Sequence, residues 1–210
     1  MPSRHDKDTL PCRVLIRGLA VVVAASAALL FPARPLAFWN VAVGDAIRDR
    51  PMVTIDGSRQ ALLGQAHATV FVICRPDHDR SLQTLRALAL LEKEFAGKPV
   101  RFVAVTSDSY SSKAVRTMMR QAGVRMEVLV DKDDQLAGDL GVDTRPAVAI
   151  ADAAHRLAAY QHFLSVNMGA VIQAQIEDVL GRQRALVHQG IPPAERDSGA
   201  PRAVVASTSR

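Results

Sequence analysis

The chain has 210 residues, of which 49% are hydrophobic and 22% are charged. These values exclude a mostly disordered protein, and the length suits one domain with additional terminal segments. The formal net charge of +5 comes from the ends, because residues 1–37 and 182–210 each contain five basic and two acidic residues. A nucleic-acid-binding domain carries its positive charge on the folded part, so we expect no nucleic-acid partner.

The N-terminal segment, residues 1–37, has the features of an export signal. Four basic residues precede an apolar run at 18–31, and prolines follow it. The run is shorter than the ~20 residues of a membrane span, which is typical of a signal peptide. Two alternatives remain open: cleavage near Ala37, or retention as an inner-membrane anchor formed by residues 14–31. The basic flank predicts a cytoplasmic N-terminus and a domain exported to the periplasm.

The other end, residues 182–210, is rich in proline, serine and arginine and has no apolar period. This composition predicts a disordered basic tail. The folded domain is therefore expected at 38–181.

Within that domain, apolar β-rich runs alternate with segments in which apolar residues recur every three or four positions. The expected strands are 52–55, 67–74, 100–106, 127–130, 147–151 and 156–160. The expected helices are 82–95, 112–122, 133–140 and 166–180, the last one ending at Gly181. This order predicts an α/β fold with a central mixed sheet and helices on both faces.

Several short motifs resemble the thioredoxin-like superfamily, in particular its exported redoxin group related to TlpA. The chain opens with VGD at 43–45 and DG at 56–57, and residues 128–152 resemble the group's "vLvDpdg…GVxgxP…fliD" segment. Pro146 falls on the family's cis-proline, which the resemblance places beside the active site. The resemblance covers about residues 41–181.

The active-site motif itself is missing. Redox-active members have W-C-x-x-C where the first buried strand leads into a helix, and the helix N-terminus lowers the thiol pKa there. In this chain, Arg75 stands at the tryptophan position, while Pro76 and Asp79 stand at the two cysteine positions. The two cysteines are Cys12, before the apolar run, and Cys74. An exported domain would hold only Cys74, and dithiol exchange within one chain needs two thiols.

Three readings of this region follow. In the first, Cys74 is a catalytic thiol of a single-cysteine peroxidase or oxidoreductase, with Arg145 or Arg75 stabilising the thiolate. The resemblance to peroxiredoxins suggests this role, but their P-x-x-x-T-x-x-C motif is absent. In the second, Cys74 binds copper together with His78 and His162, because cysteine and histidine are suitable ligands for a soft metal. The spacing is weak support for such a site, and we expect no metal or other cofactor.

In the third and favoured reading, the fold is kept without thiol chemistry. The two loops at this end of the sheet would then bind a periplasmic protein partner, or an extended peptide, by strand addition. An aspartate at a helix start is also a common N-cap, which is a structural alternative for Asp77 and Asp79. The residues expected to form the partner-binding surface are Arg75, Pro76, Asp77, His78, Asp79, Thr144, Arg145 and Pro146.

Overall fold

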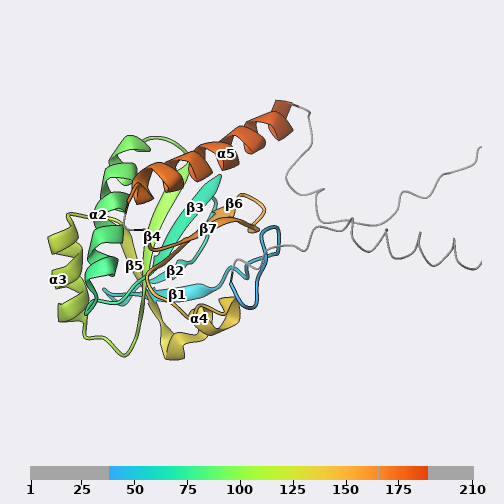
Figure 1. Cartoon of the computed structure of the whole chain (residues 1–210). Helices are drawn as coiled ribbons and strands as arrows, with labels where there is room; N and C mark the ends of the chain where they lie inside the picture. Colours follow the sequence, from blue (N-terminus) through green and yellow to red (C-terminus); the bar gives the residue numbers. More distant parts are fainter. Residues whose placement is uncertain (1–37, 165, 189–210) are drawn as a thin grey trace, which may run out of the picture. The chain divides into compact units, whose positions relative to one another are not determined.

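The computed structural model describes residues 38–164 and 166–188, and Figure 1 shows their arrangement. The expected signal or anchor, residues 1–37, and residues 189–210 of the expected tail lie outside the described residues. The strands are β1 (Pro51–Thr54), β2 (Arg59–Ala61), β3 (Ala68–Ile73), β4 (Val100–Ser107), β5 (Glu127–Asp131), β6 (Ala147–Asp152) and β7 (Leu157–His162). The helices are α2 (Asp79–Glu94), α3 (Ser112–Ala122), the 3₁₀ turn η1 (Lys132–Asp134), α4 (Gln135–Leu140) and α5 (Met168–His188).

The strands form one mixed sheet in the order β2-β1-β5-β4-β3-β6-β7. The three central strands β5, β4 and β3 are parallel to one another, whereas the strand pairs outside them are antiparallel. All six residues of β3 are buried. A continuous apolar run is what a strand covered on both faces requires, so the expected fold class, α/β with a mixed sheet, is confirmed.

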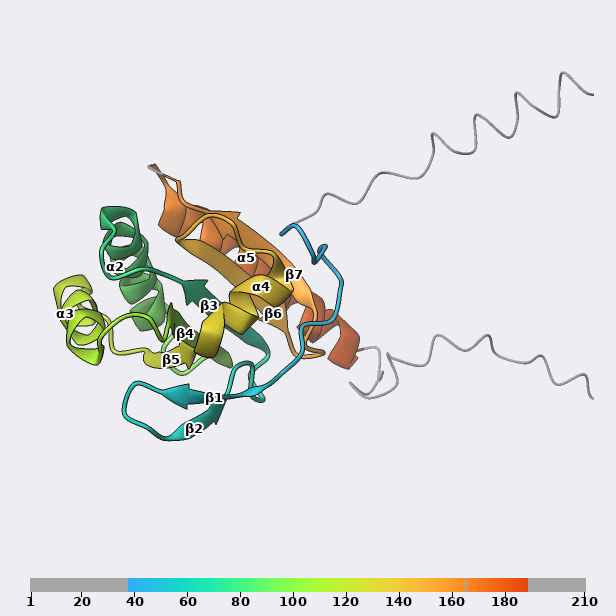
Figure 2. The ribbon, with the colours of Figure 1, turned by 90° about the horizontal axis from the view of Figure 1, so that it is seen from below.

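Helices and an extended segment cover the two faces of this sheet (Figures 1 and 2). On one face, α2, α3 and α5 bury a cluster that includes Leu85, Val115 and Ile172. On the other face, α4 and the segment leading to β1 bury a second cluster that includes Phe38 and Leu136. Successive side chains of β3 and β4 point to opposite faces of the sheet and enter the two clusters in turn, so both strands contribute to both cores.

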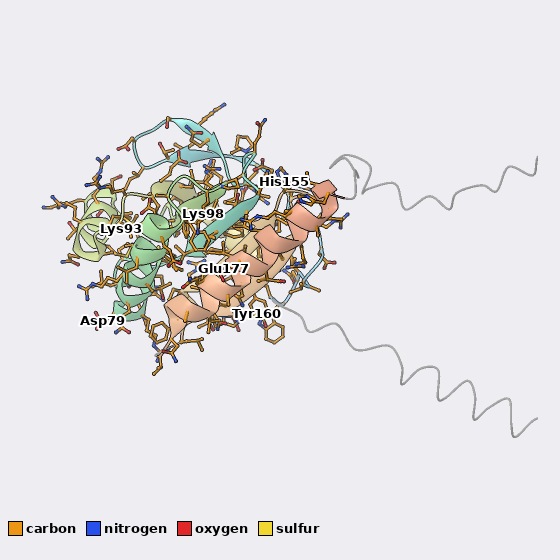
Figure 3. All side chains as sticks on the ribbon, turned by 90° about the horizontal axis from the view of Figure 1, so that it is seen from above. Asp79, Lys93, Lys98, His155, Tyr160 and Glu177 are labelled. Atoms are coloured by element: carbon orange, nitrogen blue, oxygen red, sulfur yellow. The ribbon has the colours of Figure 1, made fainter. Side chains whose placement is uncertain are left out.

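Helix α2 starts at the end of the sheet where the expected site lies. Its N-cap is His78, whose Nδ1 accepts a hydrogen bond from the Arg80 N–H at 3.3 Å. The interpretation of Asp77 or Asp79 as the N-cap is therefore wrong. Asp79 lies in the first turn of the helix and Lys93 in the last turn, at the opposite end (Figure 3). Both charges complement the helix dipole.

Two elements differ from the sequence-based expectation. Strand β2 was not expected, because its sequence, Arg-Gln-Ala, shows no apolar alternation. In the structure its three residues are exposed or half-buried. The expected end of the last helix at Gly181 is wrong, because α5 continues to His188. The buried face of α5 extends to Gln183, and Arg182 forms an ion pair with Asp178 at 2.9 Å, so packing continues past the glycine. Residues 182–188 of the expected tail are therefore helical.

Candidate functional site

The sheet register brings the two expected site segments together. Ile73, the last residue of β3, pairs with Ala147, the first residue of β6. The loop that follows β3 therefore lies beside Thr144, Arg145 and Pro146, which precede β6. The peptide bond between Arg145 and Pro146 is cis, at the position that the resemblance assigned to a cis-proline.

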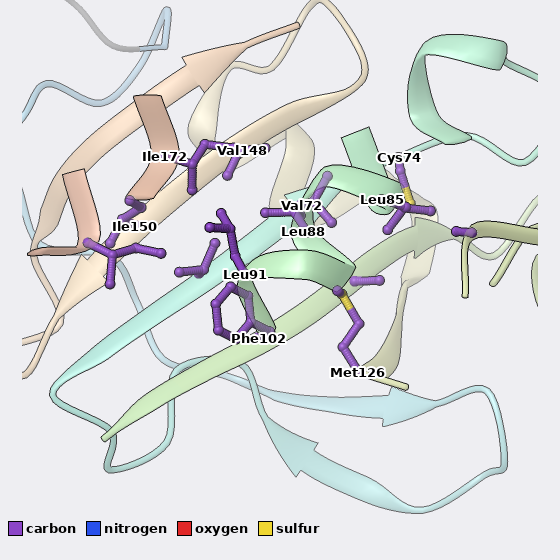
Figure 4. Close-up of a cluster of buried hydrophobic side chains, with 14 of the residues drawn as sticks. Val72, Cys74, Leu85, Leu88, Leu91, Phe102, Met126, Val148, Ile150 and Ile172 are labelled. Atoms are coloured by element: carbon purple, nitrogen blue, oxygen red, sulfur yellow. The ribbon is translucent and has the colours of Figure 1, made fainter. Parts of the chain in front are cut away.

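Cys74 lies in the core at this end of the sheet. Only 1% of the residue is exposed, and its side chain belongs to the cluster under α2, beside Leu85 (Figure 4). Its thiol donates a hydrogen bond to the Val105 carbonyl at 3.5 Å, and its N–H donates to the same oxygen at 2.9 Å. The sulfur is thus directed into the protein and away from the loop surface.

The electrostatic environment keeps this thiol neutral. Burial raises the pKa of Cys74 to about 12, and the nearby positive charge of Arg145 lowers it only in part. Arg145 is itself engaged in an ion pair with Asp134, with its Nη2 atom 2.9 Å from a carboxylate oxygen. A reactive cysteine needs an accessible thiolate at neutral pH. The pair of candidate catalytic residues, Cys74 and Arg145, does not have this arrangement.

The loop after Cys74 is held by its own polar groups. The Arg75 side chain donates two hydrogen bonds to the Asp77 carboxylate, at 3.2 and 3.0 Å, and its backbone N–H donates to Ser81 Oγ at 3.0 Å. The hydrogen bond from Arg75 also holds the pKa of Asp77 below its ordinary value. Asp77 and Asp79 are exposed, while Arg75, Pro76 and His78 are half-buried.

The residues of the copper hypothesis are not brought together as ligands. The sulfur of Cys74 faces the α2 cluster, whereas the His162 ring packs against Phe38 and Tyr160 on the other face of the sheet. His78 uses Nδ1 to cap α2. Among residues 38–164 and 166–188, no group of three or more His, Cys, Asp or Glu side chains is arranged to hold a metal ion.

Two aromatic side chains, Phe163 and Trp39, lie near this edge and were not expected there from the sequence. His162 pairs with Ala147, so the end of β7 and the following Phe163 lie next to Pro146. The Arg80 guanidinium lies over the Phe163 ring, 5.4 Å from its centroid. Trp39, 72% exposed, donates a hydrogen bond from Nε1 to the Asp143 carboxylate at 3.0 Å, and this bond lowers the pKa of Asp143.

Thr144 and Arg145 precede β6 and do not take part in the sheet. Within the described part of the chain, no backbone N–H or C=O of these two residues forms a hydrogen bond, and neither residue belongs to a strand. Thr144 is exposed. Unpaired backbone groups beside a sheet offer hydrogen bonds to an added extended segment.

Comparison with solved structures places this architecture in a known fold. The chain has a thioredoxin-like fold, and the neighbours include several thiol-disulfide oxidoreductases. A secreted disulfide oxidoreductase from Mycobacterium tuberculosis, homologous to E. coli DsbE, aligns with a TM-score of 0.53 and 14% identity, covering 62% of this chain and 96% of that one. A putative thiol:disulfide interchange protein DsbE from Chlorobium tepidum aligns with a TM-score of 0.59 and 18% identity, covering 67% and 99%.

A hypothetical protein from Sinorhizobium meliloti aligns with a TM-score of 0.60 and 18% identity, covering 67% of this chain and 85% of that one. No protein-family model and no curated protein matches the chain. At these identities the likeness defines the fold, and the activity has to be argued from the site.

Proposed function

We propose that this chain is an exported thioredoxin-fold accessory factor that binds an extended segment of a protein partner and carries out no dithiol exchange. The observation that carries the proposal is the state of Cys74: buried, directed into the core and with a pKa of about 12. The loop Arg75–His78 contains no cysteine. Pro76 and Asp79 stand at the positions that the resemblance assigns to the two cysteines of the redox-active members.

The proposed partner-binding surface consists of Arg75, Pro76, Asp77, His78, Asp79, Thr144 and Arg145; the eighth expected residue, Pro146, is buried next to Arg145. Its unpaired backbone at Thr144 and Arg145 supports strand addition, because an extended peptide gains affinity from main-chain hydrogen bonds. Exposed Trp39 and half-buried Phe163 flank the same edge. Aromatic side chains provide large contact areas in protein interfaces, so they favour a protein partner over a small polar substrate.

Export is part of the proposal and is supported by the apolar run at 18–31 with its basic flank. Similarity to a secreted disulfide oxidoreductase agrees with it. None of the described helices is long and apolar enough to cross a membrane. The segment proposed as signal or anchor lies outside the described residues.

An activity assay tests the absence of thiol chemistry. The full chain and its Cys74→Ser variant are compared for insulin-disulfide reduction and for peroxide consumption, with free thiol as reference. We expect neither protein to exceed the reference, because the thiol is neutral and inaccessible at neutral pH. Wild-type turnover that disappears in a folded Cys74→Ser variant would establish a single-cysteine enzyme and overturn the proposal.

A crosslinking assay tests the surface itself. A photoreactive amino acid replaces Thr144, and in a matched control it replaces exposed Lys93 at the far end of α2. Irradiation in a periplasmic extract should attach a discrete protein at position 144 and not at position 93. Equal labelling at both positions would mean that this edge is not a selective binding surface.

A further inference from the structure

A second concave surface lies on another part of the domain. Helix α3, the turn between β1 and β2, and β5 enclose a groove of about 560 Å³. Figures 1 and 2 both show α3 beside that turn, and Arg116 of α3 forms an ion pair with Asp56 of the turn at 2.8 Å. The groove shares no residue with the partner-binding surface proposed above. Its volume lies within the range of ordinary binding pockets.

The floor of the groove is apolar and recessed. Met119, Met126 and Val128 line it, and each of these residues is less than one-tenth exposed. Half-buried Ile55 and Val124 complete the apolar lining. Methionine side chains are unbranched and adaptable, so a floor that contains two of them can accommodate apolar groups of different shape.

The rim of the groove is basic. Lys113, Arg116 and Arg120 follow one another on α3, and Arg125 lies beyond the end of the helix. The acidic residue among the lining side chains is Asp56, which is paired with Arg116. Among the described residues, no carboxylate forms an ion pair with the other three cations. The formal charge of residues 38–181 is close to neutral, so this surface is a local concentration of positive charge.

The spacing of the cations indicates the form of the ligand. Lys113 and Arg120 are two helical turns apart, which corresponds to about 10 Å along the axis of α3. An amphiphile with one head group would neutralise one end of this row and leave the other cations unpaired. A linear segment with several carboxylates can pair with the whole row while its apolar side chains enter the groove.

We propose that this groove binds an acidic peptide segment with interspersed apolar side chains, supplied by a partner protein. The chain's own terminal segments, residues 1–37 and 189–210, carry net positive charge and are unsuitable occupants. A membrane surface is also disfavoured, because membrane-binding faces insert protruding apolar side chains. Here the apolar side chains are recessed below the cations.

The test measures fluorescence anisotropy of a short labelled peptide of repeating leucine-glutamate-glutamate, titrated with the full chain. A peptide of repeating serine-glutamate-glutamate has the same charge without the apolar groups. We expect at least about tenfold weaker binding of the serine peptide, because it leaves the apolar floor uncovered. Binding of the leucine peptide should also weaken as salt increases, because exposed charges are screened.

The double variant Lys113→Glu with Arg120→Glu should bind the leucine peptide at least about tenfold more weakly, since two attractions become repulsions. A control with the same charge change, Arg86→Glu with Arg184→Glu, alters exposed positions outside the groove and should retain wild-type affinity. Circular dichroism and thermal unfolding verify that both variants fold. Should the reversal variant unfold, the milder pair Lys113→Gln with Arg120→Gln takes its place.

Three results would overturn the proposal. Equal loss of binding in the groove variant and the control would show that the peptide responds to the net charge of the protein and not to the groove. Dodecanoate binding as tightly as the leucine peptide, with the same dependence on Lys113 and Arg120, would indicate an amphiphile site. Sedimentation of the wild-type chain, and not the groove variant, with phosphatidylglycerol vesicles in the absence of peptide binding would indicate a membrane surface.

Discussion

The side chain of Cys74 shows how burial changes the acidity of a thiol. A cysteine in the first turn of a helix has its thiolate stabilised by the helix dipole and by solvent. Cys74 instead directly follows the last residue of β3, before the loop that leads to the N-cap His78, and its sulfur packs under α2. Desolvation of the thiolate outweighs the attraction of Arg145, so the neutral thiol is strongly favoured.

The first prediction is that Cys74→Ser lowers the free energy of unfolding by about 1 kcal/mol or more. Transfer from water to an apolar site costs more free energy for a hydroxyl than for a thiol. The Val105 carbonyl is the hydrogen-bond acceptor within reach of the serine hydroxyl. Urea denaturation monitored by circular dichroism measures the difference. Wild-type stability of the serine variant would mean that the site is more polar than the structure shows.

The second prediction concerns alkaline pH. The pKa of Cys74 rises from an ordinary value of about 9 to about 12 on folding, so the folded state holds its proton when the unfolded chain has lost it. The protonated thiol therefore contributes its full stabilisation below pH 9. As the pH rises from 9 toward 12, the free energy of unfolding falls by up to about 1.4 kcal/mol per pH unit. Urea denaturation at a series of pH values, with Cys74→Ala as control, isolates this contribution. A constant difference between the two proteins from pH 8 to 11 would contradict the prediction.

At the scale of the elements, packing extends structure beyond what local signals predict. Strand β2 forms by pairing with β1 across the turn at Asp56–Gly57, where Gly57 has a positive φ of 89°. Helix α5 continues through Gly181 to His188, and past the glycine Gln183 is buried and Leu186 half-buried. Glycine costs about 1 kcal/mol inside a helix, which buried contacts on either side can offset.

The third prediction tests that extension. A chain ending at Gly181 should unfold with a free energy about 1–2 kcal/mol lower than a chain ending at His188, because the first loses buried Gln183 and half-buried Leu186. Thermal unfolding of the two truncated chains gives the comparison. Equal midpoints would show that the last two turns of α5 add nothing to the fold.

At the scale of the whole molecule, different surfaces have different chemical character. The edge at the loop after β3 combines unpaired backbone, polar side chains and exposed Trp39. The groove at α3 combines a recessed apolar floor with a basic rim. Both surfaces are built on one domain that has a hydrophobic core on each side of its sheet.

The fourth prediction is that the N-terminal segment directs export. Residues 1–45 fused to a reporter that is active only outside the cytoplasm should give a signal, because the apolar run and its basic flank are recognised as a signal or anchor. A control fusion in which two leucines of the run, Leu29 and Leu30, are replaced by arginine should be silent. A stably expressed but inactive wild-type fusion would contradict export.

The sequence by itself determined the elements that periodicity and local chemistry specify. Continuous apolar runs predicted β3 and β4 as strands, and the structure buries all six residues of β3 and the last six of β4. The motif around Pro146 predicted the thioredoxin-like fold, and the register of β3 with β6 places this segment beside the loop after Cys74. These features depend on neighbours in the chain, so a single sequence can reveal them.

Only the tertiary structure decided which side chains meet across long distances in the chain. Trp39 and Asp143 are 104 positions apart, and their hydrogen bond has no local signal. The direction of the Cys74 sulfur continues the alternation of side chains along β3, and a shift of one position would reverse it. The groove at α3 combines residues from three separate segments. The nearly neutral net charge of the domain gives no indication that these basic side chains gather on one surface.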